Sequence, residues 1–161
     1  MTKGRLGTRN KRAYLLYLLV PLLAGLDQLS KLWAVSVYGG VITLIPDWLA
    51  VRVILNHGLA FGLGAGPDGM PATVTVLVTF ILLLPLIVAG WRTAPTKTMR
   101  HGGFACMIGG AMGNMVDRAR HGYVVDFIDI RALPTFNLAD IALLTGMALV
   151  LFDLFYTASR D

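Results

Sequence analysis

One apolar run, residues 72–91, limits the possible folds more strongly than any other stretch of the sequence. It has the length of about 20 residues that an α-helix needs to cross the hydrocarbon core of a bilayer. Further apolar runs of similar length begin near Ala13, His101 and Asn137. Hydrophobic residues make up 56% of the chain and charged residues only 14%. The sequence therefore predicts a polytopic membrane protein and excludes an ordinary soluble domain.

The predicted fold class is an all-α polytopic membrane protein that forms one domain over residues 1–161. Small residues are frequent in the third helix, where a Gly109-x-x-x-Gly113 pair lets a neighbouring helix approach closely. Close packing and the shaping of a cavity explain these glycines equally well. The four transmembrane helices are expected at about residues 13–37, 72–91, 101–118 and 137–156.

The connection between the first two helices, residues 38–71, is too long for a simple loop. Turn-forming pairs such as Gly39-Gly40 and Pro46-Asp47 divide it. Residues 48–55 have the composition of a strand or of an interfacial segment anchored by Trp48. We therefore expect a small extracytoplasmic β-rich segment between helices 1 and 2. Residues 119–136 are expected to form a second polar connection.

The positions of the basic residues indicate how the chain crosses the membrane. Residues 1–12 and 92–100 contain Lys and Arg but no acidic residue, whereas residues 38–71 contain only Arg52 as a basic residue. Cytoplasmic loops of membrane proteins carry an excess of Lys and Arg. Both termini are therefore expected in the cytoplasm, and the two polar connections on the outer side. On this reading the net charge of +5 reflects orientation, and nucleic acid is not an expected partner.

Two pairs of polar residues fall at the outer end of the bundle in this topology. Asp27 and Lys31 are four residues apart and share a helix face, so we expect an ion pair. Asn114 and Arg118 share a face in the same way. The second pair either solvates a helix end or helps to position a carboxylate, which arginine can bind through two hydrogen bonds.

The predicted strand ends in Asn56-His57-Gly58. Asn and Gly are typical of turns because they tolerate unusual backbone angles, so a turn is the simpler explanation. The functional alternative is a loop in which Asn56 and Gly58 hold an extended peptide.

Asp126 lies in the second polar connection, and Asp140 lies near the start of the last helix. Each has an ordinary structural explanation, because loop aspartates are usually solvated and Asn137 with Asp140 resembles a capping box. Both nevertheless fall at the same membrane level. Two carboxyl groups held close together share one proton, so one activates water while the other hydrogen-bonds a scissile carbonyl. The pattern therefore predicts an aspartic-protease dyad.

Other catalytic chemistries fit the sequence poorly. His57, His101 and His121 do not have the spacing of metal ligands, so no metal is expected. Ser30 and Lys31 are adjacent and point to different sides of a helix, which excludes a Ser/Lys dyad. No organic cofactor is expected either.

Five short motifs together resemble the lipoprotein signal peptidase family, also called signal peptidase II. They occur in the family's order, and they extend from residue 27 to residue 140. The motifs are Asp27-Gln28-x-x-Lys31, Asn56-x-Gly58-x-Ala60-Phe61-Gly62, Gly109-Gly110-Ala111-x-Gly113-Asn114-x-x-Asp117-Arg118, Val125-Asp126-Phe127 and Phe136-Asn137-x-Ala139-Asp140.

The resemblance implies an aspartic endopeptidase that removes the signal peptide from diacylglyceryl-modified prolipoproteins at the outer face of the bacterial cytoplasmic membrane. It implies that Asp126 and Asp140 are the catalytic dyad, and that residues 38–71 form a small sheet with a gating helix. It further implies contact with membrane lipid, inhibition by peptides of the globomycin type, and a monomer. The residues expected to bind substrate or support the site are Asp27, Lys31, Asn56, Gly58, Asn114, Arg118 and Asn137.

Asp129 is an expected decoy, since it is close to Asp126 in sequence but matches no motif residue. The segment 127–136 is shorter than the resemblance leads us to expect. Without the resemblance, a small transporter or an ion-binding subunit that uses buried Asp residues as a relay remains an alternative. A relay requires acidic groups at several depths, whereas these cluster at one level. A structural assembly subunit would leave that clustering unexplained.

Overall fold

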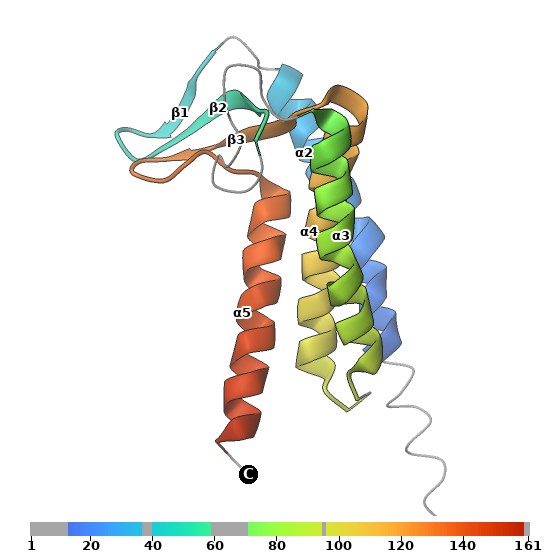
Figure 1. Cartoon of the computed structure of the whole chain (residues 1–161). Helices are drawn as coiled ribbons and strands as arrows, with labels where there is room; N and C mark the ends of the chain where they lie inside the picture. Colours follow the sequence, from blue (N-terminus) through green and yellow to red (C-terminus); the bar gives the residue numbers. More distant parts are fainter. Residues whose placement is uncertain (1–12, 37–39, 59–70, 95, 160–161) are drawn as a thin grey trace, which may run out of the picture.

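The computed structural model describes residues 13–36, 40–58, 71–94 and 96–159, and long helices dominate it (Figure 1). Three of these helices are long and apolar enough to cross a membrane: residues Ala13–Ser36, Ala72–Arg92 and Leu138–Ala158. The elements are the short 3-10 helix η1 (Leu16–Leu18), then α2 (Leu19–Ser36), β1 (Ile42–Ile45), β2 (Leu49–Asn56), α3 (Ala72–Arg92), α4 (Thr98–His121), β3 (Val124–Ile130) and α5 (Leu138–Ala158).

The apolar periodicity predicted the position of each helix, and the differences lie at the ends. The third predicted helix, 101–118, is observed as Thr98–His121, three residues longer at each end. It continues to Gly122, which adopts a left-handed conformation with φ of 82° and closes the helix by donating its N–H to Arg118 O. Glycine is favoured there because it has no Cβ to clash. The last helix begins one residue later than predicted because Asn137 is its N-cap.

Helix α4 is the centre of the bundle, since it packs against each of α2, α3 and α5. Its contact with α5 is a backbone-to-backbone approach. A Cβ added at Gly103 would lie 2.7 Å from Gly146 O, and one added at Gly146 would lie 2.5 Å from Gly103 O. Both distances are too short for any other residue. Gly103 of α4 is therefore required for close helix packing. Of the two explanations for the small residues, this contact supports close packing.

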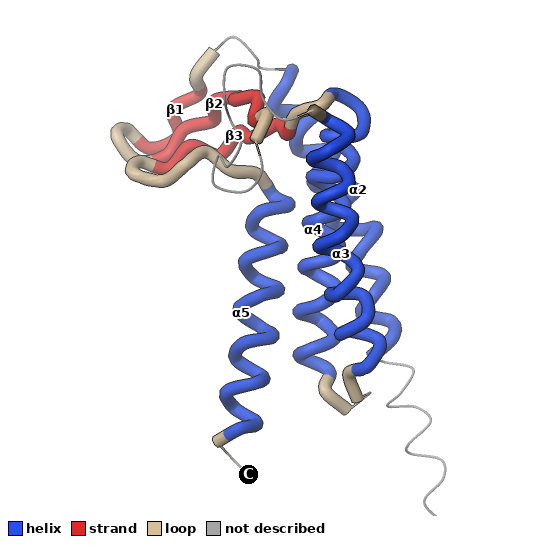
Figure 2. The backbone as a smooth tube through the Cα atoms, viewed as in Figure 1, coloured by secondary structure: helices blue, strands red, loops and turns tan. Residues whose placement is uncertain are grey.

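A three-stranded antiparallel sheet with the order β1-β2-β3 covers one end of the bundle and projects to its side (Figure 2). The strand predicted at 48–55 is confirmed as β2, Leu49–Asn56. The β-rich segment predicted between helices 1 and 2 is observed as β1 and β2. The sheet has a third strand that was not predicted, because β3 lies in the connection 119–136, which was expected only to be polar. The first four residues of β3, Val124 to Phe127, are all buried, and the strand extends the sheet from the C-terminal end of α4.

The sheet is joined to the bundle through a small apolar cluster. Ala34 near the end of α2 packs with Val51 of β2 and Phe127 of β3, and all three are buried. Burial of apolar side chains such as these is favourable by about 25 cal/mol for each Å² removed from water. The cluster holds the start of β3 against α2, which is the contact that positions Asp126. A gating helix is implied for the segment 38–71, of which residues 59–70 lie outside the described residues.

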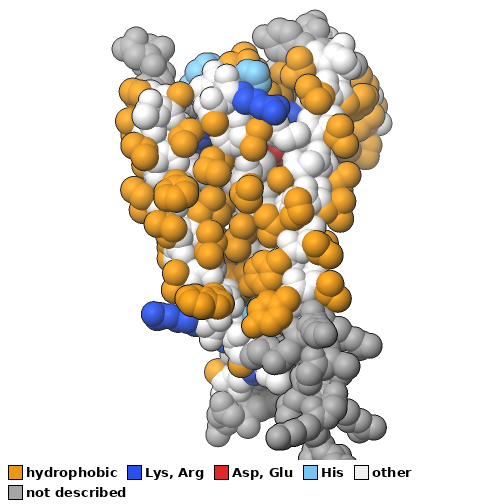
Figure 3. Space-filling model, turned by 90° about the vertical axis from the view of Figure 1, so that its right-hand side faces the viewer, with side chains coloured by type: hydrophobic (Ala, Val, Ile, Leu, Met, Phe, Trp, Pro, Cys, Tyr) orange, Lys and Arg blue, Asp and Glu red, His pale blue; other side chains and the backbone are white. Residues whose placement is uncertain are grey.

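Apolar side chains cover most of the helix surface between the two ends (Figure 3). Only 11% to 17% of the residues in the three candidate spans are buried inside the protein. Apolar surface of this extent is unstable in water and is typical of a protein surrounded by lipid. The structure therefore agrees with a membrane protein.

Candidate active site

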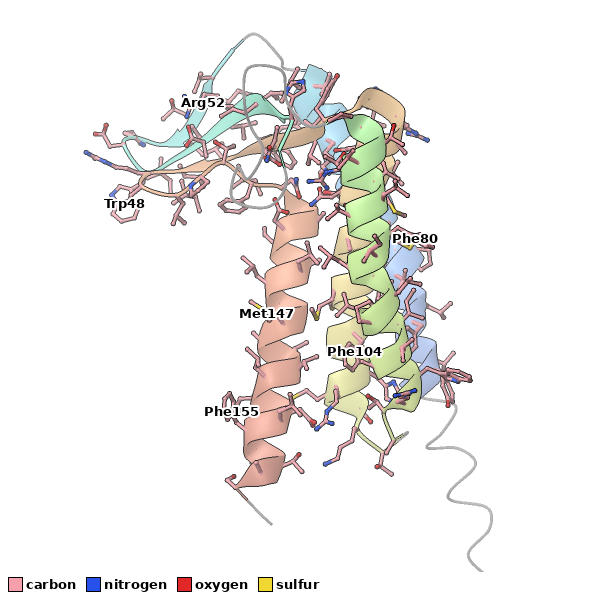
Figure 4. The ribbon with its side chains drawn as sticks, viewed as in Figure 1. Trp48, Arg52, Phe80, Phe104, Met147 and Phe155 are labelled. Carbon is pink, nitrogen blue, oxygen red and sulfur yellow. The ribbon has the colours of Figure 1, made fainter. Side chains whose placement is uncertain are left out.

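The polar residues singled out in the sequence lie where the sheet meets the helices. They come from α2, β2, α4, β3 and the start of α5. The labelled side chains Phe104, Met147 and Phe155 lie further along the helices, and Trp48 lies at the tip of the sheet (Figure 4). Buried polar groups are thus concentrated at one end, and the middle of the bundle is apolar.

Asp126 is a buried carboxyl group in β3, with 3% of its surface exposed. Its Oδ1 accepts a hydrogen bond from Asn137 Nδ2 at 2.6 Å, and its Oδ2 accepts one from Asn56 Nδ2 at 3.0 Å. Burial raises the pKa of Asp126 to about 6, and the negative charge of Asp140 adds to this rise. The hydrogen bonds from Asn56 and Asn137 and the charge of Lys31 act in the opposite direction. Asp126 therefore gains or loses a proton close to neutral pH.

Asp140 lies in the first turn of α5 and is half-buried. The predicted capping box is confirmed: Asn137 Oδ1 accepts from Asp140 N at 3.0 Å, and Asp140 Oδ2 accepts from Asn137 N at 3.2 Å. The other oxygen, Oδ1, accepts from Asn114 Nδ2 at 2.9 Å. The N-terminus of a helix favours a negative charge, so this position suits an ionised carboxylate.

A tight chain reversal brings the two aspartates together. After β3, the backbone turns and Phe136 pairs with Ile128: Phe136 N donates to Ile128 O at 3.1 Å and Ile128 N donates to Phe136 O at 2.8 Å. The next residue, Asn137, then lies beside Asp126 and also caps the helix that carries Asp140. The chain reversal over residues 127–136 therefore brings the two carboxyl groups to one asparagine.

Lys31 is the centre of a buried ionic network beneath these aspartates. The predicted ion pair with Asp27 is confirmed at 2.7 Å. Lys31 Nζ also lies 2.8 Å from Asp117 Oδ2, and it donates to Asn114 Oδ1 at 2.9 Å. An ammonium group has three N–H donors, so these contacts use all of them. Asn114 is consequently held from one side by Lys31 while it donates to Asp140 from the other.

Arg118 connects α4 to the loop after β2. The guanidinium is buried and donates from NH2 to Gly58 O at 3.2 Å. Asn56 Oδ1 accepts from Gly58 N at 3.0 Å, which is the turn that the sequence favours. Asn56 also donates to Asp126, so the turn after β2 is hydrogen-bonded directly to the candidate site. The Nε of Arg118 has no hydrogen-bond partner among the described residues.

The remaining chemistry-bearing residues lie apart from this cluster. Asp129 is on the opposite face of β3 from Asp126, since strand side chains alternate, and it pairs with Arg52 at 2.9 Å. His57 and His121 both contact the ring of Tyr123 near the C-terminal end of α4, and His101 contacts Tyr17 near its N-terminal end. In the described ranges, no group of three or more His, Cys, Asp or Glu side chains is arranged to hold a metal ion.

Two residues of the ionic network around Lys31, Asp117 and Gln28, were not among those expected from the sequence to support the site. Asp117 Oδ2 accepts from Val125 N at 3.1 Å, and Gln28 Nε2 donates to Asp117 Oδ1 at 2.7 Å. A sequence signal existed for both. Asp117 is three residues after Asn114 on the same helix face, and Gln28 is adjacent to Asp27.

Comparisons with known proteins identify close relatives of this chain. The family model for signal peptidase (SPase) II matches residues 19–156. A lipoprotein signal peptidase from Moorella thermoacetica is 38% identical over 147 residues, which cover 89% of this chain and 95% of the relative. One from Synechocystis is 37% identical over 139 residues, covering 83% of each, and one from Caulobacter vibrioides is 33% identical over 152 residues, covering 90% and 89%.

Two solved structures have the same fold. A bacterial membrane enzyme determined by the in meso method at 2.3 Å resolution superimposes with a TM-score of 0.78 at 28% identity, covering 89% of each chain. A second, determined at 1.9 Å, superimposes with a TM-score of 0.73 at 29% identity, covering 85% of this chain and 90% of that one.

Proposed function

This chain belongs to the signal peptidase II family, and from that premise we propose that Asp126 and Asp140 are the catalytic dyad with which it cleaves signal peptides from prolipoproteins. The enzyme is thus a peptidase, and its substrates are prolipoproteins. The observation that carries the dyad is the shared partner: Asn137 donates to Asp126 from its side chain and to Asp140 from its backbone. The two carboxyl groups also interact with each other, since the negative charge of Asp140 contributes to the raised pKa of Asp126.

The proposed reaction is hydrolysis of a peptide bond by activated water. The ionised carboxylate takes a proton from water as the water attacks the scissile carbonyl carbon, and the protonated carboxyl group hydrogen-bonds the carbonyl oxygen. The tetrahedral intermediate then collapses, the C–N bond breaks, and the leaving amine takes up a proton from the dyad. Such a pair titrates as a unit, with two macroscopic pKa values.

At a pH where the dyad holds one proton, we assign that proton to Asp126. Its burial raises its pKa to about 6, whereas Asp140 is half-buried at the positive end of α5. Asp140 is then the carboxylate that activates water. Arg118 interacts electrostatically with both carboxyl groups, and its Nε–H, which has no partner among the described residues, is suited to bind a substrate carbonyl.

We infer four transmembrane helices, with α4 as the fourth. Its polar side chains Asn114, Asp117 and Arg118 are buried against the other helices and do not face lipid. A helix of this kind has low mean hydropathy and still crosses a bilayer, because the surrounding helices shield its polar groups. Since α4 contacts every other long helix, we further infer that residues 1–161 form one domain.

The proposed orientation has both termini in the cytoplasm and the active site on the outer side of the bacterial cytoplasmic membrane. The α3–α4 turn and the C-terminus lie at the end opposite the sheet (Figure 1). Residues 1–12 and the segment 92–100 are basic and lack acidic residues. The positive-inside rule therefore supports an outward-facing sheet and site.

A diacylglyceryl group on the substrate would be compatible with this site. The acyl chains of a prolipoprotein already lie in the bilayer, and the apolar helix surface continues up to the level of Asp140. The substrate can therefore reach the dyad sideways from the membrane, with its lipid in contact with the helices. Surrounding membrane lipid is the second partner in this proposal.

The proposal also includes the oligomeric state and a class of inhibitor. The hydrogen bonds that hold the two aspartates can all be made within one chain, so a monomer is sufficient for the proposed reaction. Peptides of the globomycin type would bind in place of the extended substrate, between Asn56 and the dyad. No metal or organic cofactor takes part in the proposed reaction.

A proton or ion relay fits the structure less well. In α4 no charged residue occurs between Arg100 and Asp117, and in α5 none occurs between Asp140 and Asp153. A relay needs exchangeable groups at successive depths. The apolar middle of both helices therefore favours a peptidase over a transporter.

The test is cleavage of a purified diacylglyceryl-modified prolipoprotein in detergent, followed on a gel. Asp126→Asn and Asp140→Asn are expected to lower the rate by about 1,000-fold or more, because each removes a group that holds or transfers a proton. Asp129→Asn is the matched control, since it removes an aspartate three residues away that pairs only with the half-exposed Arg52. Its rate should stay within about twofold of wild type. Normal cleavage by either dyad variant would disprove the assignment.

A further inference from the structure

The residue directly before each proposed catalytic aspartate donates its backbone N–H to a buried carboxylate. Asp117 in α4 accepts from Val125 N at 3.1 Å, directly before Asp126. Asp27 in α2 accepts from Ala139 N at 2.9 Å, directly before Asp140. The two acceptors are alike in burial, with 3% exposure for Asp117 and 0% for Asp27. The main chain next to Asp126 in β3 and the main chain next to Asp140 in α5 are thus each held by a hydrogen bond to a buried carboxylate.

One lysine joins the two carboxylates. Lys31 Nζ lies 2.7 Å from Asp27 Oδ2 and 2.8 Å from Asp117 Oδ2. The network therefore runs from Val125 through Asp117, Lys31 and Asp27 to Ala139. It connects β3 to α5 by a route separate from Asn137, which links the side chains of the dyad directly.

We propose that Asp117 is a positioning residue, which together with Asp27 and the lysine between them sets the separation of the two catalytic carboxyl groups. The proposal rests on the function proposed above. Asp117 holds the β3 side of the dyad and Asp27 holds the α5 side. Neither touches the reacting carboxyl groups, so both act through the backbone that carries them.

Two features of the network go beyond what packing alone requires. Replacing a buried ionic cluster with apolar side chains of similar size is often neutral or stabilising, so stability is a weak reason for two buried carboxylates and a lysine. The bundle also makes room for them at Gly113, where an added Cβ would lie 2.6 Å from Asp27 Oδ2. Gln28 then fixes the orientation of Asp117, because its Nε2 donates to Asp117 Oδ1 and to Gly113 O.

The separation of the dyad has a direct chemical consequence. The interaction between two carboxyl groups falls with distance, and it separates the two macroscopic pKa values of the pair. A wide separation of pKa values gives a broad pH range in which the pair holds one proton, which is the active form. The charged groups that face the dyad are Lys31 from α2 and Arg118 from α4. Loosening of β3 would therefore both slow the reaction and narrow its pH profile.

The experiment compares wild type with Asp117→Asn in the prolipoprotein cleavage assay, measuring kcat and KM from pH 4 to pH 9. The variant keeps the size of the side chain but loses the charge beside Lys31, and one of its two acceptor oxygens becomes a donor. We expect kcat to fall on the order of 100-fold, as for a misplaced catalytic group. We expect KM to change little and the bell-shaped pH profile to become narrower.

Asp153→Asn is the matched control for stability. Asp153 is a half-buried carboxylate between α4 and α5 that pairs with Arg100 at 2.7 Å, at the opposite end of the bundle. Its loss also removes a charge that joins two helices, so it should lower the melting temperature. The pH profile and kcat of the folded Asp153→Asn enzyme should remain those of wild type.

Gln28→Met provides a second test in case Asp117→Asn does not fold. It leaves every charge in place and removes the amide that donates to Asp117, Asp27 and Gly113 O, so we expect a smaller change in the same direction. The proposal would be overturned if folded Asp117→Asn had the kcat and the pH profile of wild type. If Asp117→Asn does not fold, the same result for Gln28→Met would overturn it. Inactive Asp126→Asn and Asp140→Asn alongside that result would show that the dyad assignment stands and only the positioning role fails.

Discussion

Asn137 performs two tasks with one side chain. Its amide oxygen caps α5 by accepting from Asp140 N at 3.0 Å, and its amide nitrogen donates to Asp126 at 2.6 Å. A cap of this kind stabilises a helix by about 1 kcal/mol. The capping box and the dyad, which are competing explanations at the level of sequence, are here parts of one arrangement. The residue that begins the helix also orients the proposed acid.

The raised pKa of Asp126 predicts a gain in stability when the charge is removed. Burial raises this pKa from 3.8 to about 6, so the folded state binds the proton more tightly than the unfolded chain. Ionisation of Asp126 as the pH rises from about 4 to about 6 therefore destabilises the folded state. Asp126→Asn carries no charge, and we expect it to be more stable than wild type at pH 7 by about 1–2 kcal/mol.

Thermal unfolding in detergent at pH 4 and pH 7 checks this expectation. Most of the advantage of Asp126→Asn should disappear near pH 4, where the wild-type carboxyl group is neutral in the folded state and close to its ordinary pKa in the unfolded chain. The gain is reduced by one hydrogen bond, because the new amide NH2 meets a donor from Asn56 or Asn137. A variant less stable than wild type at pH 7 would show that Asp126 is not penalised by its burial.

Among the elements, β3 and the turn after it have the largest effect on the site. The turn lets Phe136 pair with Ile128, and Ala132 within it adopts a left-handed backbone with φ of 70°. The turn also contacts the β1–β2 hairpin, since Arg131 N donates to Trp48 O at 3.1 Å. The sheet is therefore continuous from its tip to the dyad. Contact of the tip with lipid would help to hold β3 in place.

Trp48 is expected to lie in the lipid interface as an anchor for the sheet. Its side chain is 65% exposed at the tip, where Leu44, Ile45 and Leu133 are also exposed. Tryptophan favours the boundary between lipid and water. In a Trp33→Phe, Trp91→Phe double variant, Trp48 is the one tryptophan left, and lipids brominated near the headgroup should quench its fluorescence. Equal fluorescence in brominated and ordinary vesicles would contradict the anchor.

On the scale of the whole molecule, polar and apolar groups are separated by depth. The ionic network and the proposed dyad lie at the sheet end, the middle of the helices is apolar, and Arg100 pairs with Asp153 at the other end. Charged groups are costly in the hydrocarbon core and tolerable when paired near its boundaries. This distribution lets water reach the dyad at the membrane surface while the helices remain in lipid.

The proposed orientation predicts opposite labelling at the two ends of the bundle. In a Cys106→Ser background, a new cysteine is introduced by Arg131→Cys in the exposed turn after β3, or by Thr96→Cys in the α3–α4 turn. A membrane-impermeant thiol reagent added to intact spheroplasts should label the Arg131→Cys variant only. The Thr96→Cys variant should react once the membrane is opened. The reverse pattern would place the site in the cytoplasm.

Much of the fold and of the site follows from local patterns in the sequence. Apolar length locates the helices, the i, i+4 spacing places Lys31 beside Asp27, and Asn137 with Asp140 forms the predicted cap. Each of these depends on residues close together in the chain, whose geometry in a helix is known in advance. The motifs that resemble signal peptidase II then identify the family, which the comparisons confirm.

Only the tertiary structure decided how these segments meet. The strand β3 has a partner 70 residues away in sequence, as the hydrogen bond from Asn56 to Asp126 shows, and no local pattern specifies that pairing. The contacts of Asp117 with Val125 and of Asp27 with Ala139 likewise depend on how α2, α4 and α5 pack. Local sequence sets which conformation a segment adopts, whereas its distant partners are selected by burying apolar surface and by hydrogen-bonding or pairing the buried polar groups at the same time.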